Sequence, residues 1–227
     1  MKNLLTLILL VTTATLLSSQ VEYSSYKDSD AEATLILNKI YNSIAESEDY
    51  KVEFTINIEF PGYQPEVQTG TLVQSGSNYL FNSGDQAIYA FNDTIWTHHI
   101  PQKEVYIDER NLSEGVDNLG LSPIQLLGTY QSEDFVYAIL NTEPFESSTR
   151  YFIEFKPLID NPDYSKLRVD VVDGSIPTLE SIVVFNKDGS RYSITLDSID
   201  TAIGVDESVF QFNAAKFPGI HIEDIRL

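Results

Sequence analysis

The sequence predicts a mainly β protein with some α-helix, built on one antiparallel sheet. Residues 70–108 contain five short runs rich in β-branched and aromatic residues, separated by turn residues such as Ser75-Gly76 and Asn92-Asp93. Residues 50–60 alternate apolar and polar side chains without a break. Because a parallel crossover needs about a dozen residues, such closely spaced strands pair as antiparallel neighbours.

The alternating segment 50–60 is the clearest predicted strand. Its apolar side chains all point to one side of the sheet, so that face is apolar and the other faces water. A register shift of one residue would expose all of these apolar side chains to water, so the register of this strand is strongly specified. These side chains are Val52, Phe54, Ile56, Ile58 and Phe60.

A helix is predicted before this strand. Ser29-Asp30 supplies an N-cap, and the helical pattern continues to about Glu46. Its apolar residues share one face, which must pack on the sheet, while Asn38 and Lys39 lie on the polar side. The apolar face consists of Ala33, Ile36, Leu37, Ile40, Tyr41 and Ile44.

The second half of the chain continues the strand pattern. A short helix is predicted over 122–128, with Ser122 as N-cap, Pro123 first and Gly128 at its end. Residues 110–120 and 158–166 are predicted loops. Further strands are predicted at 134–141, 149–156, 167–172, 178–186 and 191–197. We find no repeat or linker that would divide the chain, so 21–227 is predicted to be one domain.

Charge and cysteine content argue against several classes of partner and chemistry. The chain has 34 Asp and Glu against 14 Lys and Arg, a formal net charge of −20. Such a surface repels phosphate backbones and argues against nucleic acid or electrostatic attachment to an anionic leaflet. The absence of cysteine excludes disulfides, thiol chemistry and a lipid-modified N-terminal cysteine.

The first twenty residues have the layout of a secretory signal peptide. Lys2 precedes an apolar run over 4–17, and Ser18-Ser19-Gln20 follow as small polar residues. We expect cleavage near residue 20 and an exported, soluble mature protein. The alternative, an uncleaved anchor, is disfavoured because the run is short for a bilayer span.

The search for catalytic chemistry leads to a prediction of no enzyme, no metal and no cofactor. His98 and His99 are adjacent on a predicted strand and therefore point to opposite faces. The acidic pairs Asp108-Glu109 and Glu133-Asp134 are interpreted as solvated surface. There is no hydrolase nucleophile motif and no phosphate-binding loop. The 12 Phe and 13 Tyr leave two interpretations open, an ordinary packed core or a groove for acyl chains or apolar peptides.

Several motifs, in order, resemble the periplasmic outer-membrane lipoprotein carrier family of the LolA type. The similarity covers nearly the whole chain after the signal peptide. The matching segments are Ala31-Glu32-Ala33, Gly70-Thr71-Leu72, Asn92-Asp93-Thr94-Ile95-Trp96, His99-Ile100-Pro101, Ser122-Pro123-Ile124-Gln125-Leu126-Leu127, Asp188-Gly189-Ser190-Arg191-Tyr192, Phe210-Gln211-Phe212, Phe217-Pro218-Gly219-Ile220 and Asp224-Ile225-Arg226.

The resemblance implies a half-open antiparallel β-barrel whose concave apolar face is covered by the N-terminal helix and short lid helices. It implies a monomeric periplasmic carrier that shields lipoprotein acyl chains in a hydrophobic cavity and shuttles them from the inner to the outer membrane. The implied partners are acylated lipoproteins, an inner-membrane lipoprotein-releasing transporter and an outer-membrane acceptor. Two alternatives remain: a protein of the same fold that binds or senses lipid without shuttling, and a secreted polysaccharide-active enzyme.

We predict a set of lipid-binding cavity residues on the concave face. They are Phe54, Ile56, Ile58, Leu72, Ile88, Ile124 and Leu127.

The chain departs from the family at one functional point. Family members carry an Arg-Pro pair before the Asn that Asn78 matches, and that arginine is tied to holding the lid. Here Ser75-Gly76-Ser77 takes its place, with no basic residue near in the sequence. We therefore predict that apolar contacts of Ile124, Leu126 and Leu127 mainly hold the lid.

Overall fold

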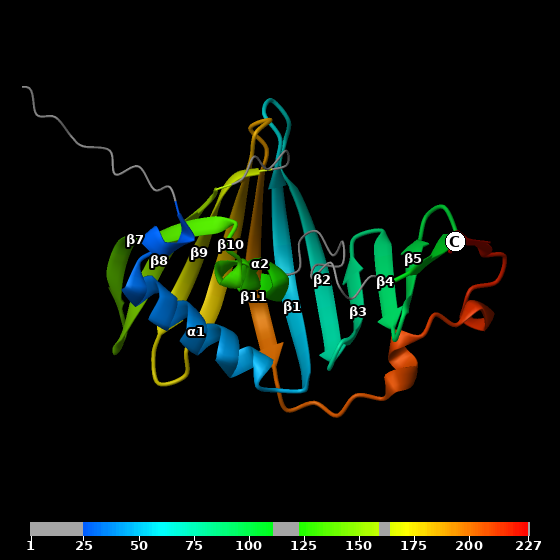
Figure 1. Cartoon of the computed structure of the whole chain (residues 1–227). Helices are drawn as coiled ribbons and strands as arrows, with labels where there is room; N and C mark the ends of the chain where they lie inside the picture. Colours follow the sequence, from blue (N-terminus) through cyan, green and yellow to red (C-terminus); the bar gives the residue numbers. More distant parts are fainter. Residues whose placement is uncertain (1–24, 111–122, 159–163, 227) are drawn as a thin grey trace, which may run out of the picture.

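The computed structural model describes residues 25–110, 123–158 and 164–226, and the predicted signal peptide lies outside them. The described chain forms one large curved sheet that does not close, with helices on one side (Figure 1). The strands are β1 (Asp49–Glu59), β2 (Glu66–Ser75), β3 (Asn78–Ser83), β4 (Gln86–Phe91), β5 (Thr94–His99), β6 (Glu104–Glu109), β7 (Phe135–Phe145), β8 (Ser148–Pro157), β9 (Tyr164–Asp173), β10 (Thr178–Asn186), β11 (Arg191–Asp200) and β12 (His221–Asp224). The helices are α1 (Ala31–Ala45) and α2 (Pro123–Gly128), with 3-10 turns η1 (Tyr26–Asp28), η2 (Thr129–Gln131), η3 (Glu207–Phe210) and η4 (Ala214–Lys216).

The strand order is β12-β6-β5-β4-β3-β2-β1-β11-β10-β9-β8-β7. Every neighbouring pair is antiparallel except β12 and β6, which are parallel. The predicted antiparallel sheet is therefore confirmed, with β12 as its exception. Because the long segment between β11 and β12 returns the chain to the far edge, β12 can pair with β6 in the parallel direction.

Several predicted boundaries need correction. Strand β7 continues past residue 141 to Phe145, because its last residues pair with β8 through Pro144 and Thr149. Strand β9 already begins at Tyr164, inside the segment 158–166 that was predicted to be a loop. The predicted cap Ser122 and almost all of the predicted loop 110–120 lie outside the described residues.

The first helix forms where it was predicted. The carboxylate of Asp30 accepts hydrogen bonds from the backbone N–H groups of Glu32 and Ala33, at 2.8 and 3.3 Å. This cap satisfies N–H groups that have no partner within the helix. The apolar face is buried against the sheet at Ala33, Ile36, Leu37, Ile40 and Ile44.

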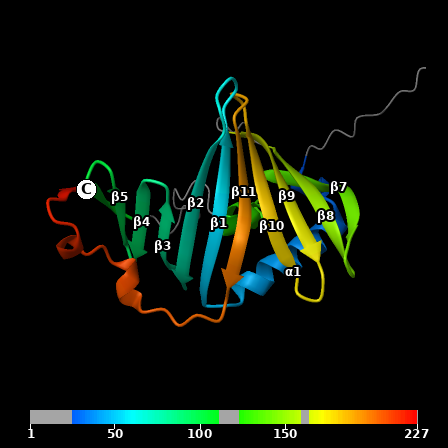
Figure 2. The same ribbon diagram turned by 180° about the vertical axis from the view of Figure 1, so that it is seen from behind.

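Strand β1 lies in the middle of the sheet, between β2 and β11. Its alternate residues are buried along its whole length, as the sequence pattern predicts. We call the face that carries Val52, Phe54 and Ile56 the inner face; it is the face covered by α1 and α2 (Figure 1). The opposite face is the outer face, seen in front of α1 in Figure 2.

The C-terminal segment closes a small second cluster at the β3–β6 end of the sheet. Phe210 of η3 is fully buried, and η3 packs on β3 and β4. The imidazole of His98 lies edge-on to the rings of Phe212 and Phe217, with centroid distances of 5.5 and 4.7 Å. His98 is 2 % exposed and points to the outer face, because the preceding residue Thr97 pairs with Ile88, which lies on the inner face.

Candidate functional site

The inner face carries a continuous apolar surface that crosses the strands. In register, Val52 of β1 lies beside Leu72 of β2, Leu72 beside Phe81 of β3, and Phe81 beside Ile88 of β4. Because paired residues share a face, these four side chains form one row across the sheet. The inward orientation of Leu72 and Ile88, which the short strands left open in the sequence, comes from this register.

All seven predicted cavity residues belong to one cluster on this face. Five come from the sheet and two, Ile124 and Leu127, from α2. Their exposed fractions lie between 0 and 8 %. They are therefore buried, and an acyl chain could reach them only if a segment that covers them moved.

Phe54 lies at the centre of this surface, and its ring occupies the space left by the missing side chain of Gly70. A Cβ added to Gly70 would lie far inside van der Waals contact with the Phe54 ring. The ring instead lies over the bare backbone of β2 and stacks on Phe81, with centroids 5.7 Å apart. A glycine facing an aromatic residue on the next strand is thus required by packing here.

The two helices meet each other as well as the sheet. Helix α1 packs on β7 and β9, and α2 packs on β10 and on α1. Ile124 and Leu127 are buried beneath α2, and Leu126 is partly buried against the same cluster. These three residues are the ones for which the sequence predicts lid contacts, and a lid role for them stays a prediction.

A hydrogen bond that the sequence does not predict also joins α1 to the segment that follows α2. The Tyr130 hydroxyl, just after α2, donates a hydrogen bond to Oδ1 of Asn38 on α1 at 2.8 Å. The ring of Tyr130 packs edge-on against Tyr41 and Tyr137, at centroid distances of 5.8 and 6.4 Å. Asn38, assigned to the polar side of the helix, is therefore a partner of the lid. The sequence shows a tyrosine directly after the short helix, but it does not show which residue this tyrosine contacts, because Asn38 is 92 residues away.

An arginine does lie on the inner face, although none is near Ser75-Gly76-Ser77 in the sequence. The guanidinium of Arg110 lies 5.2 Å from the ring centroid of Tyr79, which is on β3 and buried. Asn78, the neighbour of Tyr79, pairs with Ser75. Arg110, directly after β6, thus places a cation near the segment Ser75-Gly76-Ser77, which has no basic residue close to it in the sequence.

Hydroxyl groups at the edge of the apolar cluster are hydrogen-bonded. Tyr50 donates to Oε1 of Gln74 at 2.7 Å, and the hydroxyls of Thr34 and Tyr137 are 3.0 Å apart. Burial raises the pKa of Tyr50 well above its ordinary value, with a smaller contribution from Tyr41. The hydroxyl therefore remains protonated and acts as a neutral donor.

A polar depression of about 440 Å³ lies beside Gly70. Its lining includes the carboxylates of Glu53 and Asp197. Glu53 alternates with the buried Phe54, so its side chain points to the outer face. A hydrogen bond from Lys51 is the main reason that the pKa of Glu53 lies below its usual value. A glycosidase general acid requires the opposite shift, so Glu53 does not suit that role.

Among the described residues, no group of three or more His, Asp or Glu side chains is placed to hold a metal ion. Within the same residues, no helix is both long enough and apolar enough to span a bilayer.

Neither a protein-family model nor a curated protein sequence matches the chain. Solved structures do match it in shape. An uncharacterised conserved protein from Thermus thermophilus superposes with a TM-score of 0.54 at 6% identity, over 85% of this chain and 99% of that one. A LolA superfamily protein from Nitrosomonas europaea gives a TM-score of 0.42 at 13% identity, over 79% and 97% of the two chains. A domain described as an outer membrane lipoprotein-sorting protein, from Vibrio parahaemolyticus, gives 0.40 at 11% identity, over 79% and 94%.

The Thermus thermophilus protein is thus similar to this chain in overall architecture. At such low identities the likeness concerns the fold alone. The curved open sheet with its N-terminal helix is the architecture that the sequence resemblance implies.

Proposed function

We propose that this protein is a periplasmic carrier that shields the acyl chains of lipoproteins and shuttles them from the inner to the outer membrane. The observation that carries the proposal is the continuous apolar inner face, part of which is covered by α1 and α2. A packed core of this kind becomes a binding surface when a cover moves. Solved proteins of similar shape include ones described as LolA superfamily and lipoprotein-sorting proteins, which agrees with this role.

The energetics explain why such a carrier is needed. Removing one methylene from water is worth about 0.8 kcal/mol, so an acyl chain of about sixteen carbons gains roughly 12 kcal/mol on burial. A lipoprotein with several chains is therefore insoluble without a cover. Non-directional apolar contact suits a carrier, because the lid and the ligand can compete for the same surface.

The remaining parts of the proposal follow from the sequence. The predicted signal peptide over residues 1–20 would export the chain, leaving 21–227 as a soluble, monomeric periplasmic domain. Its partners would be acylated lipoproteins, an inner-membrane transporter that releases them and an outer-membrane acceptor. The role requires no cofactor, metal or catalytic residue.

A release assay tests the shuttling function. Spheroplasts that hold labelled lipoprotein would be incubated with the mature protein, and soluble complex would be sought in the supernatant. We expect release by the native protein and none by Ile56→Glu, because the variant places a charge in the apolar surface. A folded Ile56→Glu protein that releases lipoprotein normally would remove β1 from the site.

The same assay separates the alternatives. A protein that binds acyl chains in solution but releases no lipoprotein would be a lipid binder or sensor of the same fold. The polysaccharide-active enzyme is disfavoured by the apolar inner face and by the lowered pKa of Glu53. Hydrolysis of an envelope polysaccharide by the purified protein would reverse that ranking.

A further inference from the structure

Two hairpin turns project together from one end of the sheet (Figures 1 and 2). One joins β1 to β2 and contains Pro61-Gly62-Tyr63-Gln64-Pro65; the other joins β10 to β11 at Asp188-Gly189. A Cβ placed on Gly189 would lie 3.1 Å from Cγ of Pro61, so the two turns touch. Each supports the other, and together they form what we call the double tip.

The double tip is rigid and carries exposed apolar side chains. Gly62 has a positive φ of 82°, and the N–H of Tyr63 donates to the carbonyl of Phe60 at 3.1 Å, which closes the turn between its two prolines. Tyr63, in the turn, is 79% exposed, and Val67, in β2 below the turn, is 65% exposed. Holding large apolar groups in water at a projecting, braced position gives the fold no stability, which points to a partner.

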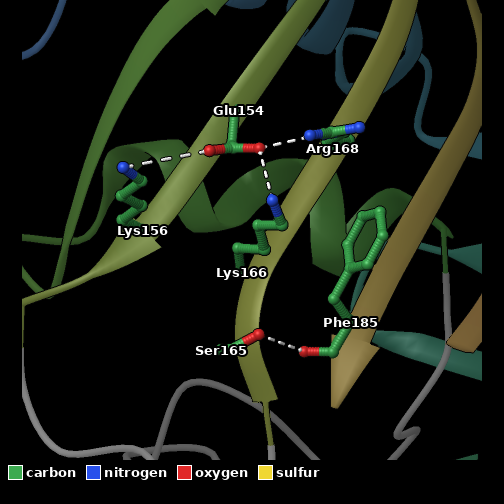
Figure 3. A network of polar contacts seen from close by, with 6 residues as sticks. All are labelled: Glu154, Lys156, Ser165, Lys166, Arg168 and Phe185. Carbon is green, nitrogen blue, oxygen red and sulfur yellow. Dashed lines mark hydrogen bonds and ion pairs between the residues drawn. The ribbon is translucent and has the colours of Figure 1, made fainter. Parts of the chain in front are cut away.

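A cluster of cations lies on the outer face just behind the double tip. Lys166, Arg168 and Arg191, from β9 and β11, surround the ring of Phe185 with their charged groups 5.0–5.2 Å from its centroid. Glu154 accepts hydrogen bonds from Lys166 at 3.0 Å and Arg168 at 2.9 Å, with Lys156 4.0 Å away (Figure 3). Three cations therefore share one carboxylate.

The cations remain accessible to a partner. The side chains of Lys156, Lys166 and Arg168 are 30–59% exposed, whereas Glu154 is 10% exposed. Acidic groups also lie nearer the tip, and Glu66 there accepts a hydrogen bond from Gln68. Glu59 pairs with Arg191 at 3.6 Å, and Asp188 accepts hydrogen bonds from Ser190. Lys156, Lys166, Arg168 and Arg191 thus outnumber the carboxylates Glu154 and Glu59 that they surround, although the chain as a whole is acidic.

We propose that the double tip and this cation cluster dock the protein on a phospholipid bilayer surface. Tyr63 enters the interface, and the cations contact lipid phosphates, with Val67 beside them because it pairs with Asn57, two residues below Glu59. Three residues separate Glu59, beside Arg191, from the end of the turn at Gly62, a span of about 10 Å. The headgroup layer is about 5–8 Å thick on each side of a bilayer. Arg191 and Lys166, which both pair with Phe185, therefore lie at phosphate level when the tip reaches the hydrocarbon boundary.

The bilayer need not be anionic. The net charge of −20 opposes a negatively charged leaflet. Zwitterionic lipids expose phosphates without that repulsion, and charges farther than about 8 Å away are screened at physiological salt. The apolar tip thus drives the docking, and the cations orient it. Docking does not rest on the acyl-carrier function, because its residues lie outside the apolar cluster.

Co-sedimentation with vesicles of phosphatidylcholine and phosphatidylethanolamine tests the proposal. We expect the exported protein to bind them, and the double variant Tyr63→Ser/Val67→Ser to bind about tenfold more weakly. Ile176→Ser is the matched control: Ile176 is 78% exposed in the turn at the other end of β10, and its loss should leave binding unchanged. Lys166→Glu/Arg168→Glu should weaken binding severalfold.

A native protein that does not sediment with the vesicles would overturn the proposal. So would a double variant that binds as the native protein does, or an equal loss in Ile176→Ser. Binding of a fluorescent fatty acid, measured without vesicles, distinguishes this result from failure of the carrier function, since Tyr63→Ser/Val67→Ser should bind the fatty acid normally. If only an acidic protein partner, and no vesicle, is retained, the surface serves a protein instead and the proposal is wrong.

Discussion

Replacing Tyr130 with Phe removes one hydroxyl from the contact between α1 and the segment that follows α2. The aromatic ring stays, so the edge-on contacts with Tyr41 and Tyr137 are preserved. The loss is the 2.8 Å hydrogen bond to Asn38, together with the 3.0 Å bond that the hydroxyl accepts from Gln131. Asn38 is only partly buried and can be hydrated when the partner is removed.

The expected size of the effect follows from that geometry. A hydrogen bond between neutral groups contributes about 1 kcal/mol net, which is about a fivefold change in an equilibrium constant. If the lid must open before an acyl chain enters, the open fraction rises about fivefold. Stopped-flow uptake of a fluorescent fatty acid should therefore be about five times faster in Tyr130→Phe.

Tyr50→Phe is the matched control. It removes a tyrosine hydroxyl bound at 2.7 Å to Gln74, but that bond joins β1 to β2 and does not hold α2. Its free energy of unfolding should fall by a similar amount without faster uptake. Equal uptake rates in Tyr130→Phe and the native protein would refute the idea that this hydroxyl latches the lid.

Three further predictions concern the lid, the sheet and the C-terminal cluster. Leu127→Ala should lower the free energy of unfolding by about 2–5 kcal/mol, because Leu127 is fully buried, and should speed fatty-acid uptake with little dependence on salt; a steep salt dependence would indicate an ion pair in the latch. Gly70→Ala should destabilise the protein by about 1–3 kcal/mol in urea denaturation, because its Cβ would collide with the Phe54 ring, and native-like stability would contradict this packing. Burial, with a smaller effect of His99, lowers the pKa of His98, so the unfolded state binds its proton more readily. Stability should therefore fall as the pH drops below about 6.5, the unfolded pKa, and His98→Leu should reduce that loss; an identical pH profile in the variant would exclude His98 as its source.

The elements that the sequence determined are those set by short-range pattern. Strand β1 follows from alternation between neighbouring residues, and α1 follows from a 3.6-residue period with Asp30 as its cap. The hairpin turn at Asp188-Gly189 follows from the positive φ that glycine tolerates. The apolar inner face was predictable for the same reason, since burial of alternate residues leaves a periodic signature.

Only the tertiary structure decided which distant segments meet. It placed β1 beside β11, β12 parallel to β6, and Asn38 under the hydroxyl of Tyr130. It buried all seven predicted cavity residues in one apolar cluster, and it gathered cations from β8, β9 and β11 on one face of an acidic chain. Local periodicity fixes the side to which a residue points. Its partner across the sheet depends on chain closure over about a hundred residues, which leaves no repeating pattern in the sequence.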